Sequence, residues 1–398
     1  MPKKITYLSM VSRKMNLSKE LHIYIVAGEP SGDYLGGELI NYLKKLYPLA
    51  RFSGVGGTKM SSHRFKSLFN MSDISVMGIV PVFLRIFSLI KRINLVKNDI
   101  IKINPDIVIL IDSPDFNHRI AKLVKKLSPN IPIICYVAPS AWAWRQGRAK
   151  RMAKYFDHLF ALFPFEVDFF KKFGLKTTYV GHPVIERIKK VDSNSTFKSR
   201  YNLKGERILI LLPGSRSSEI KRHVKYFKDV IYNIKKDHPE FDLVVAINSD
   251  KSSLIRENLG ELLIIENEEE KLLLFKEADF ACATSGTVTL ELGLSNTPMV
   301  VIYKMDIVSW LIISNLVKVN YVSLINLILG KESSKELLQN NCTSEKITKE
   351  LNEMIKNKKY QKEQIRDLQE FRTLMNFKDN NNFNKVGEVI EKILIEKN

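Results

Sequence analysis

Short apolar runs rich in β-branched residues recur along this chain, and most are followed by a segment of helical length. One series of runs lies at 21–27, 51–55, 106–112, 131–137, 158–163 and 177–180. A second series lies at 207–212, 242–247, 262–265, 279–283 and 299–303. Strands that alternate with helices at this spacing predict parallel, doubly wound sheets. We therefore predict the α/β class, with two Rossmann-like domains.

A polar stretch without apolar periodicity, at 189–196, separates the two series and predicts an interdomain linker. A chain of 398 residues is also too long for one ordinary core. The predicted divisions are an N-terminal tail (1–20), a first domain (21–186), a second domain (197–345) and C-terminal helices (346–398) that pack back on the first domain. Two such sheets bind ligands outside the carboxyl ends of their strands, so we expect a cleft between facing strand ends.

Two strand-to-helix turns in the second domain favour an anion. I-L-L-P-G-S-R-S-S-E occupies 210–219, and T-S-G-T-V-T-L-E occupies 284–291. Each turn predicts backbone N–H groups and the positive end of a helix at a sheet edge. Arg216 adds a bidentate fork for phosphate oxygens, and Glu291 is an acceptor suited to vicinal ribose hydroxyls. We predict that these turns hold the diphosphate and ribose of a sugar nucleotide.

The first domain offers carboxylates at two strand ends. Asp112 and Asp115 follow an apolar strand, and a carboxylate there can act as a base if a low dielectric raises its pKa. The alternative is that one of the two only caps the next helix. Glu29 and its neighbours follow the first strand in a Gly-containing turn that is not G-x-G-x-x-G. Capping by Ser31 or Asp33 is the alternative to substrate contact there.

The net charge of +19 favours anionic partners, but an AT-rich genome accounts for it equally well. The sequence carries no nucleic-acid-binding signature, so we predict no nucleic acid partner. The three cysteines are far apart, which predicts reduced core residues and neither disulfides nor metal ligands. The basic N-terminus lacks an apolar run and a cleavage site, so we expect no secretory signal.

Eleven short motifs follow one another in a fixed order. The first half holds A-G-E-P-S-G-D (27–33), G-V-G-G-T-K-M (54–60), V-M-G-I-V (76–80), I-D-S-P-D-F-N (111–117), P-S-A-W-A-W-R-Q (139–146), F-P-F-E (163–166) and V-G-H-P (180–183). The second half holds L-P-G-S-R (212–216), S-G-T-V-T-L-E (285–291), P-M-V-V-I-Y-K-M (298–305) and Y-V-S-L-I-N-L-I (321–328). Together they closely resemble the lipid-A-disaccharide synthase family, over roughly 21–338.

The resemblance implies a two-domain, inverting glycosyltransferase of the GT-B type that needs no metal and no cofactor. Such an enzyme joins UDP-2,3-diacylglucosamine to 2,3-diacylglucosamine 1-phosphate through a β-1,6 linkage and releases UDP. The acceptor belongs to domain 21–186 and the UDP-sugar to domain 197–345. The resemblance also implies a cytoplasmic protein, peripheral on the inner face of the cytoplasmic membrane, and a homodimer.

The resemblance also favours particular site residues. Asp112 matches the family's essential aspartate and is predicted to be the base, with Asp115 as a cap; Arg216 and Asn326 complete the predicted catalytic set. Trp142 and Trp144, with Arg145 and Arg148, are expected to grip the sugar and the 1-phosphate of the acceptor; the alternative is that they pack the core of a loop. The predicted substrate-binding residues are Glu29, Ser31, Gly32, Asp33, Trp144, Arg145, Gly214, Ser215, Ser285, Gly286, Thr287 and Glu291.

The segment 78–97 is apolar on most faces, with four basic residues interleaved. It is either a buried helix or a segment that dips into the headgroup region of an anionic membrane and receives acyl chains. Two other functions stay open at this point. A UDP-sugar 2-epimerase shares the two-domain build but uses no lipid acceptor, and a non-catalytic nucleotide- or lipid-binding protein needs no base.

Overall fold

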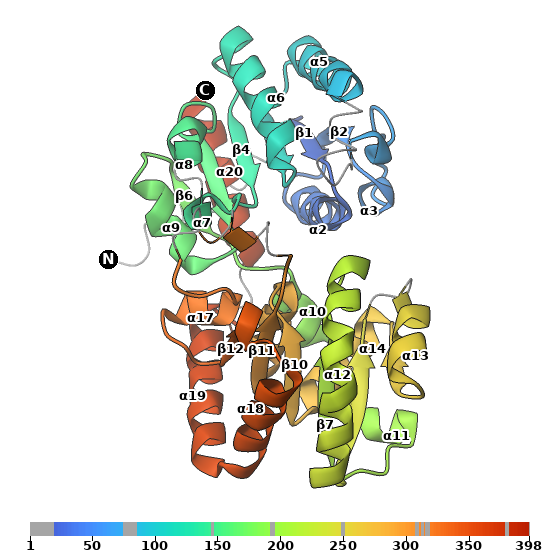
Figure 1. Cartoon of the computed structure of the whole chain (residues 1–398). Helices are drawn as coiled ribbons and strands as arrows, with labels where there is room; N and C mark the ends of the chain where they lie inside the picture. The colour runs from blue at the N-terminus through green and yellow to red at the C-terminus, as the bar shows by residue number, and fades with distance from the viewer. Residues whose placement is uncertain are drawn as a thin grey trace, which may run out of the picture. The chain divides into compact units, whose positions relative to one another are not determined.

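The computed structural model describes residues 20–74, 86–144, 147–191, 196–247, 251–306, 310–311, 314, 319–378 and 382–397. The chain divides into two compact units, here called unit 1 (Met1–Gly181 and Asn380–Asn398) and unit 2 (His182–Asp379). Each unit holds one six-stranded sheet, and every strand pair is parallel (Figure 1). The predicted fold class is therefore confirmed.

Unit 1 alternates strands and helices, and a C-terminal helix joins it. Its strands are β1 (His22–Ala27), β2 (Arg51–Val55), β3 (Ile107–Ile111), β4 (Ile133–Tyr136), β5 (His158–Ala161) and β6 (Thr177–Tyr179). Its helices are α2 (Pro30–Leu46), α3 (Thr58–Ser61), η1 (Met71–Asp73), α5 (Ile86–Ile103), α6 (Pro114–Leu127), α7 (Ala141–Trp144), α8 (Gly147–Met152), α9 (Pro164–Lys171) and α20 (Asn382–Lys397).

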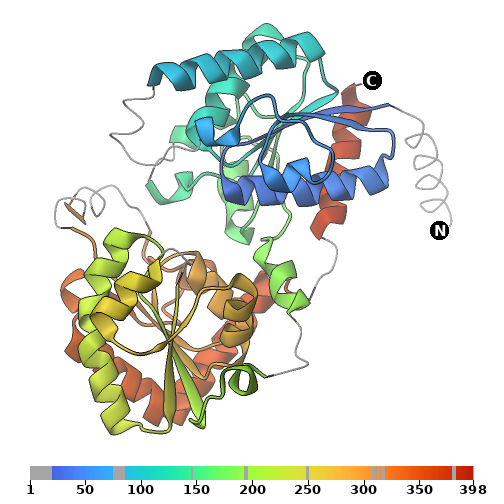
Figure 2. The ribbon, with the colours of Figure 1, turned by 90° about the vertical axis from the view of Figure 1, so that its right-hand side faces the viewer.

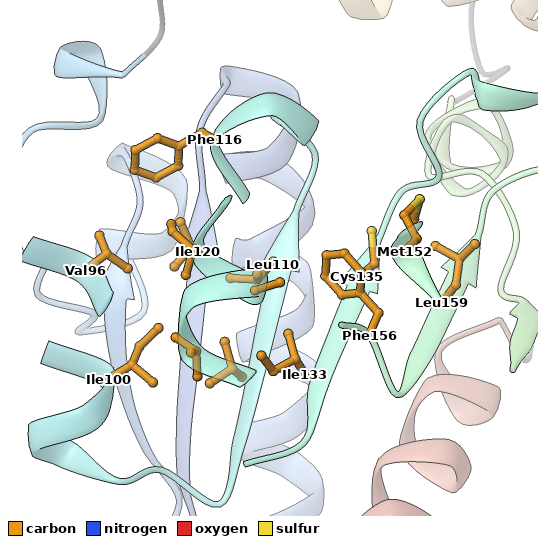
Figure 3. Close-up of a cluster of buried hydrophobic side chains, with 14 of the residues drawn as sticks. Val96, Ile100, Leu110, Phe116, Ile120, Ile133, Cys135, Met152, Phe156 and Leu159 are labelled. Atoms are coloured by element: carbon orange, nitrogen blue, oxygen red, sulfur yellow. The ribbon is translucent and has the colours of Figure 1, made fainter. Parts of the chain in front are cut away.

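The sheet of unit 1 is buried on both faces, which explains why its strands read as continuous apolar runs. On one face of the sheet, side chains such as Leu110 and Ile133 pack with α5 and α6 (Figure 3). Side chains on the other face pack with α2 and with α20, which contributes Val386 and Ile390. The red α20 accordingly lies beside the blue α2 although most of the chain separates them (Figure 1).

Unit 2 repeats the pattern. Its strands are β7 (Arg207–Leu212), β8 (Phe241–Ala246), β9 (Leu263–Ile265), β10 (Phe280–Thr284), β11 (Met299–Tyr303) and β12 (Glu336–Leu338). Its helices are α10 (Val184–Lys190), α11 (Phe197–Tyr201), α12 (Ser217–Asp237), α13 (Ser252–Leu259), α14 (Glu268–Glu277), α15 (Thr287–Ser295), α17 (Leu324–Leu329), η3 (Gln339–Asn341), α18 (Ser344–Lys356) and α19 (Lys358–Leu374). Helices cover both faces of this sheet (Figure 2).

Two predicted divisions differ from the structure. The expectation that all helices after 346 pack on the first domain is wrong for α18 and α19, because α18 buries Leu351 and Met354 in the core of unit 2 and Gln364 of α19 hydrogen-bonds Met299 of β11. Only α20 joins unit 1. The chain enters unit 2 at His182, earlier than expected, because α10 packs against α15.

The strand orders place one ligand-binding position in each unit. The orders are β2-β1-β3-β4-β5-β6 and β12-β11-β10-β7-β8-β9. The direction of winding therefore reverses between β1 and β3, and again between β7 and β10. Loops that leave adjacent strands at such a reversal diverge and open a crevice, which is where open α/β sheets bind ligands. Within the described residues, no helix is both long enough and apolar enough to cross a bilayer.

Candidate functional site

The reversal between β7 and β10 opens into a cavity of about 380 Å³ in unit 2. The turn from β7 to α12 and the turn from β10 to α15 form its mouth, so two helices begin at its wall. The first amide groups of a helix have no intrahelical acceptor and carry partial positive charge. The structure brings together here the predicted residues Gly214, Ser215, Arg216, Ser285, Gly286, Thr287 and Glu291, all of which line the cavity.

The turn after β7 is held by Glu219. Gly214 has a φ of +128°, and a Cβ on it would lie 2.8 Å from the Cβ of Glu219, so only glycine fits. The Glu219 carboxylate accepts from the amides of Ser215 (3.2 Å) and Arg216 (3.3 Å) and from the Arg216 Nη1 (3.0 Å). These two amides, expected to be free for an anion, are thus already paired. The Arg216 side chain, however, is 68% exposed at the cavity wall.

A buried histidine that the sequence did not single out supports this turn. His223 Nε2 accepts from the Lys304 amide at 3.0 Å, so the proton of the neutral ring lies on Nδ1, which donates to the Pro213 carbonyl at 3.0 Å. Burial lowers the pKa of His223 and favours this neutral form. The imidazole therefore ties the turn after β7 to the end of β11. No local motif marks it, since its partners come from distant parts of the chain.

The turn after β10 presents small groups to the cavity. The Ser285 amide donates to Ile302 (3.1 Å), and its hydroxyl donates to the Val322 carbonyl (2.9 Å). Gly286 and Thr287 are exposed where α15 begins, and the Thr289 hydroxyl closes the first turn on the Gly286 carbonyl at 2.8 Å. A diphosphate can approach this backbone closely because Gly286 has no side chain and, among the described residues, no atom beyond its two chain neighbours lies within 4 Å of the place that a Cβ would take.

Glu291 lines the cavity one turn further along α15. Burial foremost, and the charge of Glu268 next, raise the pKa of Glu291 to about 7. Burial also acts to raise the pKa of Glu268, but Lys271 and Arg187 outweigh it and lower that pKa below its usual value. The Glu268 carboxylate accepts from Arg187 Nη2 (2.9 Å) and from Lys271 Nζ. Glu291 forms no hydrogen bond or ion pair with the described residues, so its oxygens can accept from ligand hydroxyls, whereas Glu268 is held by two cations.

Asn326 makes several hydrogen bonds within unit 2, and its predicted catalytic role stays a prediction. It is fully buried on α17. Its Nδ2 donates to Ser334 O (2.7 Å) and Glu336 Oε1 (2.8 Å), and its Oδ1 accepts from the amides of Ser333 (2.9 Å) and Ser334 (3.0 Å). Asn326 thereby holds Glu336, which accepts from the Val322 amide at 2.9 Å. These contacts position the loop whose Val322 carbonyl accepts from the Ser285 hydroxyl.

The reversal between β1 and β3 in unit 1 carries Asp112 in a strained turn. Asp112 and Ser113 have φ values of +52° and +42°, a region that non-glycine residues seldom adopt. Asn117 stabilises the turn, since its Nδ2 donates to the carbonyls of Ile111 (3.0 Å) and Asp112 (2.7 Å). A Cβ on Gly28 would lie 2.1 Å from Ser113 Oγ, so glycine lets the two loops approach. The site therefore depends on Asn117, which the motif at 111–117 contains but which was given no role.

The two loops converge on the Asp112 carboxylate. Its Oδ2 accepts from the Ser31 hydroxyl at 3.2 Å, and its Oδ1 accepts from the Ser113 amide at 2.9 Å. Burial and the Asp112 charge raise the pKa of Glu29, against a hydrogen bond with Ser113 that lowers it. The structure thus brings together three predicted residues, Asp112, Ser31 and Glu29. A fixed carboxylate beside a second one that resists ionisation suits proton removal from a hydroxyl.

Two other predicted residues of the first turn make contacts within unit 1. Asp33 is buried and accepts from the amides of Gly57 (2.7 Å), Lys59 (2.8 Å) and Met60 (3.1 Å), so it caps α3, and its predicted substrate contact stays a prediction. Gly32 is buried where α2 packs on β3; a Cβ there would lie 3.5 Å from Ile111 Cγ2. Its predicted substrate contact stays a prediction.

The aromatic loop was predicted to grip the acceptor. The Trp144 side chain and Arg145 lie outside the described residues. The neighbouring Trp142 donates to Glu166 Oε1 at 3.2 Å and packs edge-on against Phe165, with ring centroids 4.9 Å apart. Burial raises the pKa of Glu166 to about 8, against its hydrogen bonds, which lower it. Trp142 is therefore part of the loop's packing.

Comparison with known proteins adds the family. The profile of the lipid-A-disaccharide synthetase family matches residues 23–390. A relative named lipid-A-disaccharide synthase, from Rickettsia prowazekii, is 40% identical over 349 residues, covering 86% of this chain and 91% of its own.

Solved structures share the fold at low sequence identity. A UDP-GlcNAc 2-epimerase from Neisseria meningitidis, bound to UDP-GlcNAc, gives a TM-score of 0.59 at 12% identity over 87% of this chain and 94% of its own. A glycosyltransferase from Rickettsia africae gives 0.54 at 13% identity over 95% and 99%. These matches show the two-domain GT-B fold alone, which epimerases share, whereas the sequence relatives carry the synthase name. The chain belongs to the lipid-A-disaccharide synthase family of glycosyltransferases.

Proposed function

We propose that this enzyme transfers 2,3-diacylglucosamine from UDP to the 6-hydroxyl of 2,3-diacylglucosamine 1-phosphate, forming the β-1,6 disaccharide of lipid A and UDP. One observation carries the proposal. Each sheet reverses its winding at the loops that hold the predicted residues, with an anion-suited cavity in unit 2 and a fixed carboxylate in unit 1. This division matches a nucleotide-sugar donor and a hydroxyl acceptor.

The chemistry follows from what each group can do. Asp112, held by Ser31 and by the Ser113 amide, takes the proton of the acceptor hydroxyl. The hydroxyl oxygen attacks the anomeric carbon with inversion as the bond from that carbon to the diphosphate oxygen breaks. The electron pair leaves with UDP, and the Arg216 guanidinium and the helix starts of α12 and α15 stabilise the added charge. Glu291 accepts from the ribose hydroxyls and fixes the nucleotide.

The test is the product. Purified full-length protein, given UDP-2,3-diacylglucosamine and the 1-phosphate acceptor in detergent, is expected to form one disaccharide 1-phosphate, identified by mass spectrometry, and one UDP for each turnover. A 2-epimerase would isomerise or cleave the UDP-sugar without acceptor, and a binding protein would release no UDP. UDP release that does not depend on the acceptor would therefore sink the proposal.

Glu291 should make donor binding depend on pH. Its carboxylate accepts ribose hydroxyls best when ionised, and its pKa is about 7. The ionised fraction grows as pH rises, so donor affinity should increase roughly three- to tenfold between about pH 6 and pH 8. The donor's diphosphate, esterified at both ends, does not titrate in that window. Calorimetry on Glu291→Gln should give weaker binding with a flat pH profile; an unchanged slope would assign the titration to another group.

We also propose that α5 docks on the membrane from which the acyl chains come. Its inner face packs in the core through Ile93, Val96 and Ile100. Its outer face leaves Phe87 85% exposed and Ile90 42% exposed, and Lys91 is exposed beside them. Exposed apolar side chains next to cations suit the headgroup boundary of an anionic bilayer. The part of the predicted segment at 78–85 lies outside the described residues.

Replacing Phe87 and Ile90 together by Ser should reduce binding to phosphatidylglycerol-containing vesicles at least about 30-fold, because the lost apolar burial on the bilayer amounts to roughly 2 to 4 kcal/mol. Unfolding temperature should change little, since both side chains are exposed. Leu49 and Leu127, each 56% exposed on unit 1, provide the matched control pair for replacement by Ser. Equal vesicle binding by the two double variants would remove α5 as the docking element.

The peripheral position on the inner face of the cytoplasmic membrane and the homodimer remain predictions. Co-sedimentation of the protein with membranes tests the first. Light scattering of the detergent-solubilised protein tests the second, with twice the chain mass as the expected result.

A further inference from the structure

Unit 1 holds a cavity of its own, of about 230 Å³, beside the turn that carries Asp112. One face of α6 and the residues of α8 and its C-terminal turn enclose it, and four cationic side chains but only one carboxylate line it: Arg119, Lys122, Arg148 and Arg151, with Asp115. We infer that this cavity binds the phosphate group of the acceptor sugar. The inference rests on the proposed function and adds to it the place of the acceptor's anionic end.

The arrangement of charges favours a small dianion. Arg148 is the inner cation, 13% exposed, with its Nη2 2.6 Å from Asp115 Oδ1. Arg119, Lys122 and Arg151 form no ion pair with any described residue. Four cations on two facing elements repel one another, and a single carboxylate does not offset them. A bound phosphate would relieve that repulsion and accept from guanidinium forks and an ammonium.

His118 adds a neutral donor to the wall of the cavity. Its Nδ1 accepts from Arg148 Nε at 3.3 Å, so the neutral ring carries its proton on Nε2. That nitrogen is buried and has no hydrogen-bond partner among the described residues. An unpaired buried donor costs free energy. A ligand oxygen or an ordered water that accepts from Nε2 would remove that cost.

Position links the cavity to the reaction. Asp115, which lines it, follows Asp112 by three residues at the same strand-to-helix junction. In the acceptor, C1, which carries the phosphate, and C5, which carries the reacting 6-hydroxymethyl group, both flank the ring oxygen, so the phosphate and the 6-hydroxyl are close neighbours on separate substituents of one hexose ring. A phosphate held over the first turns of α6 therefore leaves the 6-hydroxyl free to approach the turn that ends β3. The phosphodiester of a membrane lipid has related chemistry, but nothing ties it to the base.

The test compares two double variants, each of which removes one cation from α6 and one from α8. Lys122→Gln with Arg151→Gln alters the cavity, whereas Lys126→Gln with Lys150→Gln removes two exposed cations outside it. With the 1-phosphate acceptor, the cavity variant should raise the acceptor KM at least about tenfold, the scale of a lost charge-assisted hydrogen bond. The donor KM should stay unchanged, and the control should stay within about twofold of wild type.

A second acceptor that lacks the 1-phosphate identifies the group that is bound. Wild type and cavity variant should use it equally poorly, because the contact is absent in both. If the cavity variant is impaired equally with both acceptors, or if it instead loses phosphatidylglycerol vesicle binding relative to the control, the assignment to the acceptor phosphate is wrong. Failure of the wild type to form any disaccharide would contradict the proposed function. In that case calorimetry still tests the cavity: binding of the 1-phosphate acceptor to wild type and not to the cavity variant would support the cavity as the phosphate site.

Discussion

Asp112→Asn should lower kcat about 10²- to 10⁴-fold, the range that a general base contributes, and leave donor binding unchanged. Asn retains an oxygen that can accept from Ser31, and it tolerates the positive φ of +52° better than most residues, so the strained turn should survive. It cannot take a proton from the acceptor hydroxyl. Single-turnover kinetics with enzyme and donor both in excess over the acceptor, together with calorimetry of UDP-sugar binding, separate the two effects.

Glu29 is the rival base, and the same assay distinguishes it. Its carboxyl lies near Asp112, whose charge is one of the causes that raise the pKa of Glu29. As a positioning neighbour, Glu29→Gln should cost far less in kcat than Asp112→Asn and should shift the acidic limb of the pH–rate profile. If Asp112→Asn retains kcat within about tenfold while Glu29→Gln loses it, the roles are reversed and Asp112 supports the turn.

The fold was predictable because its signal is local and repeated. Buried parallel strands read as continuous apolar runs, and each of the eleven predicted runs overlaps a strand. The twelfth strand, β12, was missed because three residues with a polar first position give no apolar run. The helices after 346 were predicted as helices, but the unit that each one joins depends on partners far away in sequence.

The site was predictable only in part, for a related reason. The turns after β7 and β10 were identified because glycine and hydroxylic residues follow a strand directly. Asp33 was chosen from a Gly-containing turn and Asn326 from the family resemblance, and each accepts from backbone amides, 24 to 27 residues away for Asp33 and seven to eight for Asn326. Sequence alone cannot tell a polar side chain that is satisfied internally from one that faces a ligand. His223 and the cationic cavity fall outside any motif because distant residues build them.

Arg216→Ala should lower kcat/KM about 10²- to 10³-fold, comparable to removing one donor from an oxyanion site and equivalent to roughly 3 to 4 kcal/mol. The side chain is 68% exposed and its ion pair with Glu219 lies at the surface, so stability should change by less than about 1 kcal/mol. Arg216→Lys should recover only part of the loss, because an ammonium keeps the charge and lacks the fork.

The matched control is Lys221→Ala, which removes an exposed cation from the same helix without touching the cavity and should leave kcat/KM unchanged. How the loss in Arg216→Ala divides between kcat and the donor KM tells whether the guanidinium stabilises the transition state or the bound donor. A fall in kcat means that it meets charge that develops as UDP departs, whereas a rise in the donor KM alone means that it binds ground-state diphosphate. Because Glu219 Oε1 accepts from Arg216 Nη1, moving the guanidinium costs an interaction that a growing negative charge outweighs, and we expect the loss in kcat. Unchanged kcat and KM together would exclude Arg216 from the nucleotide site.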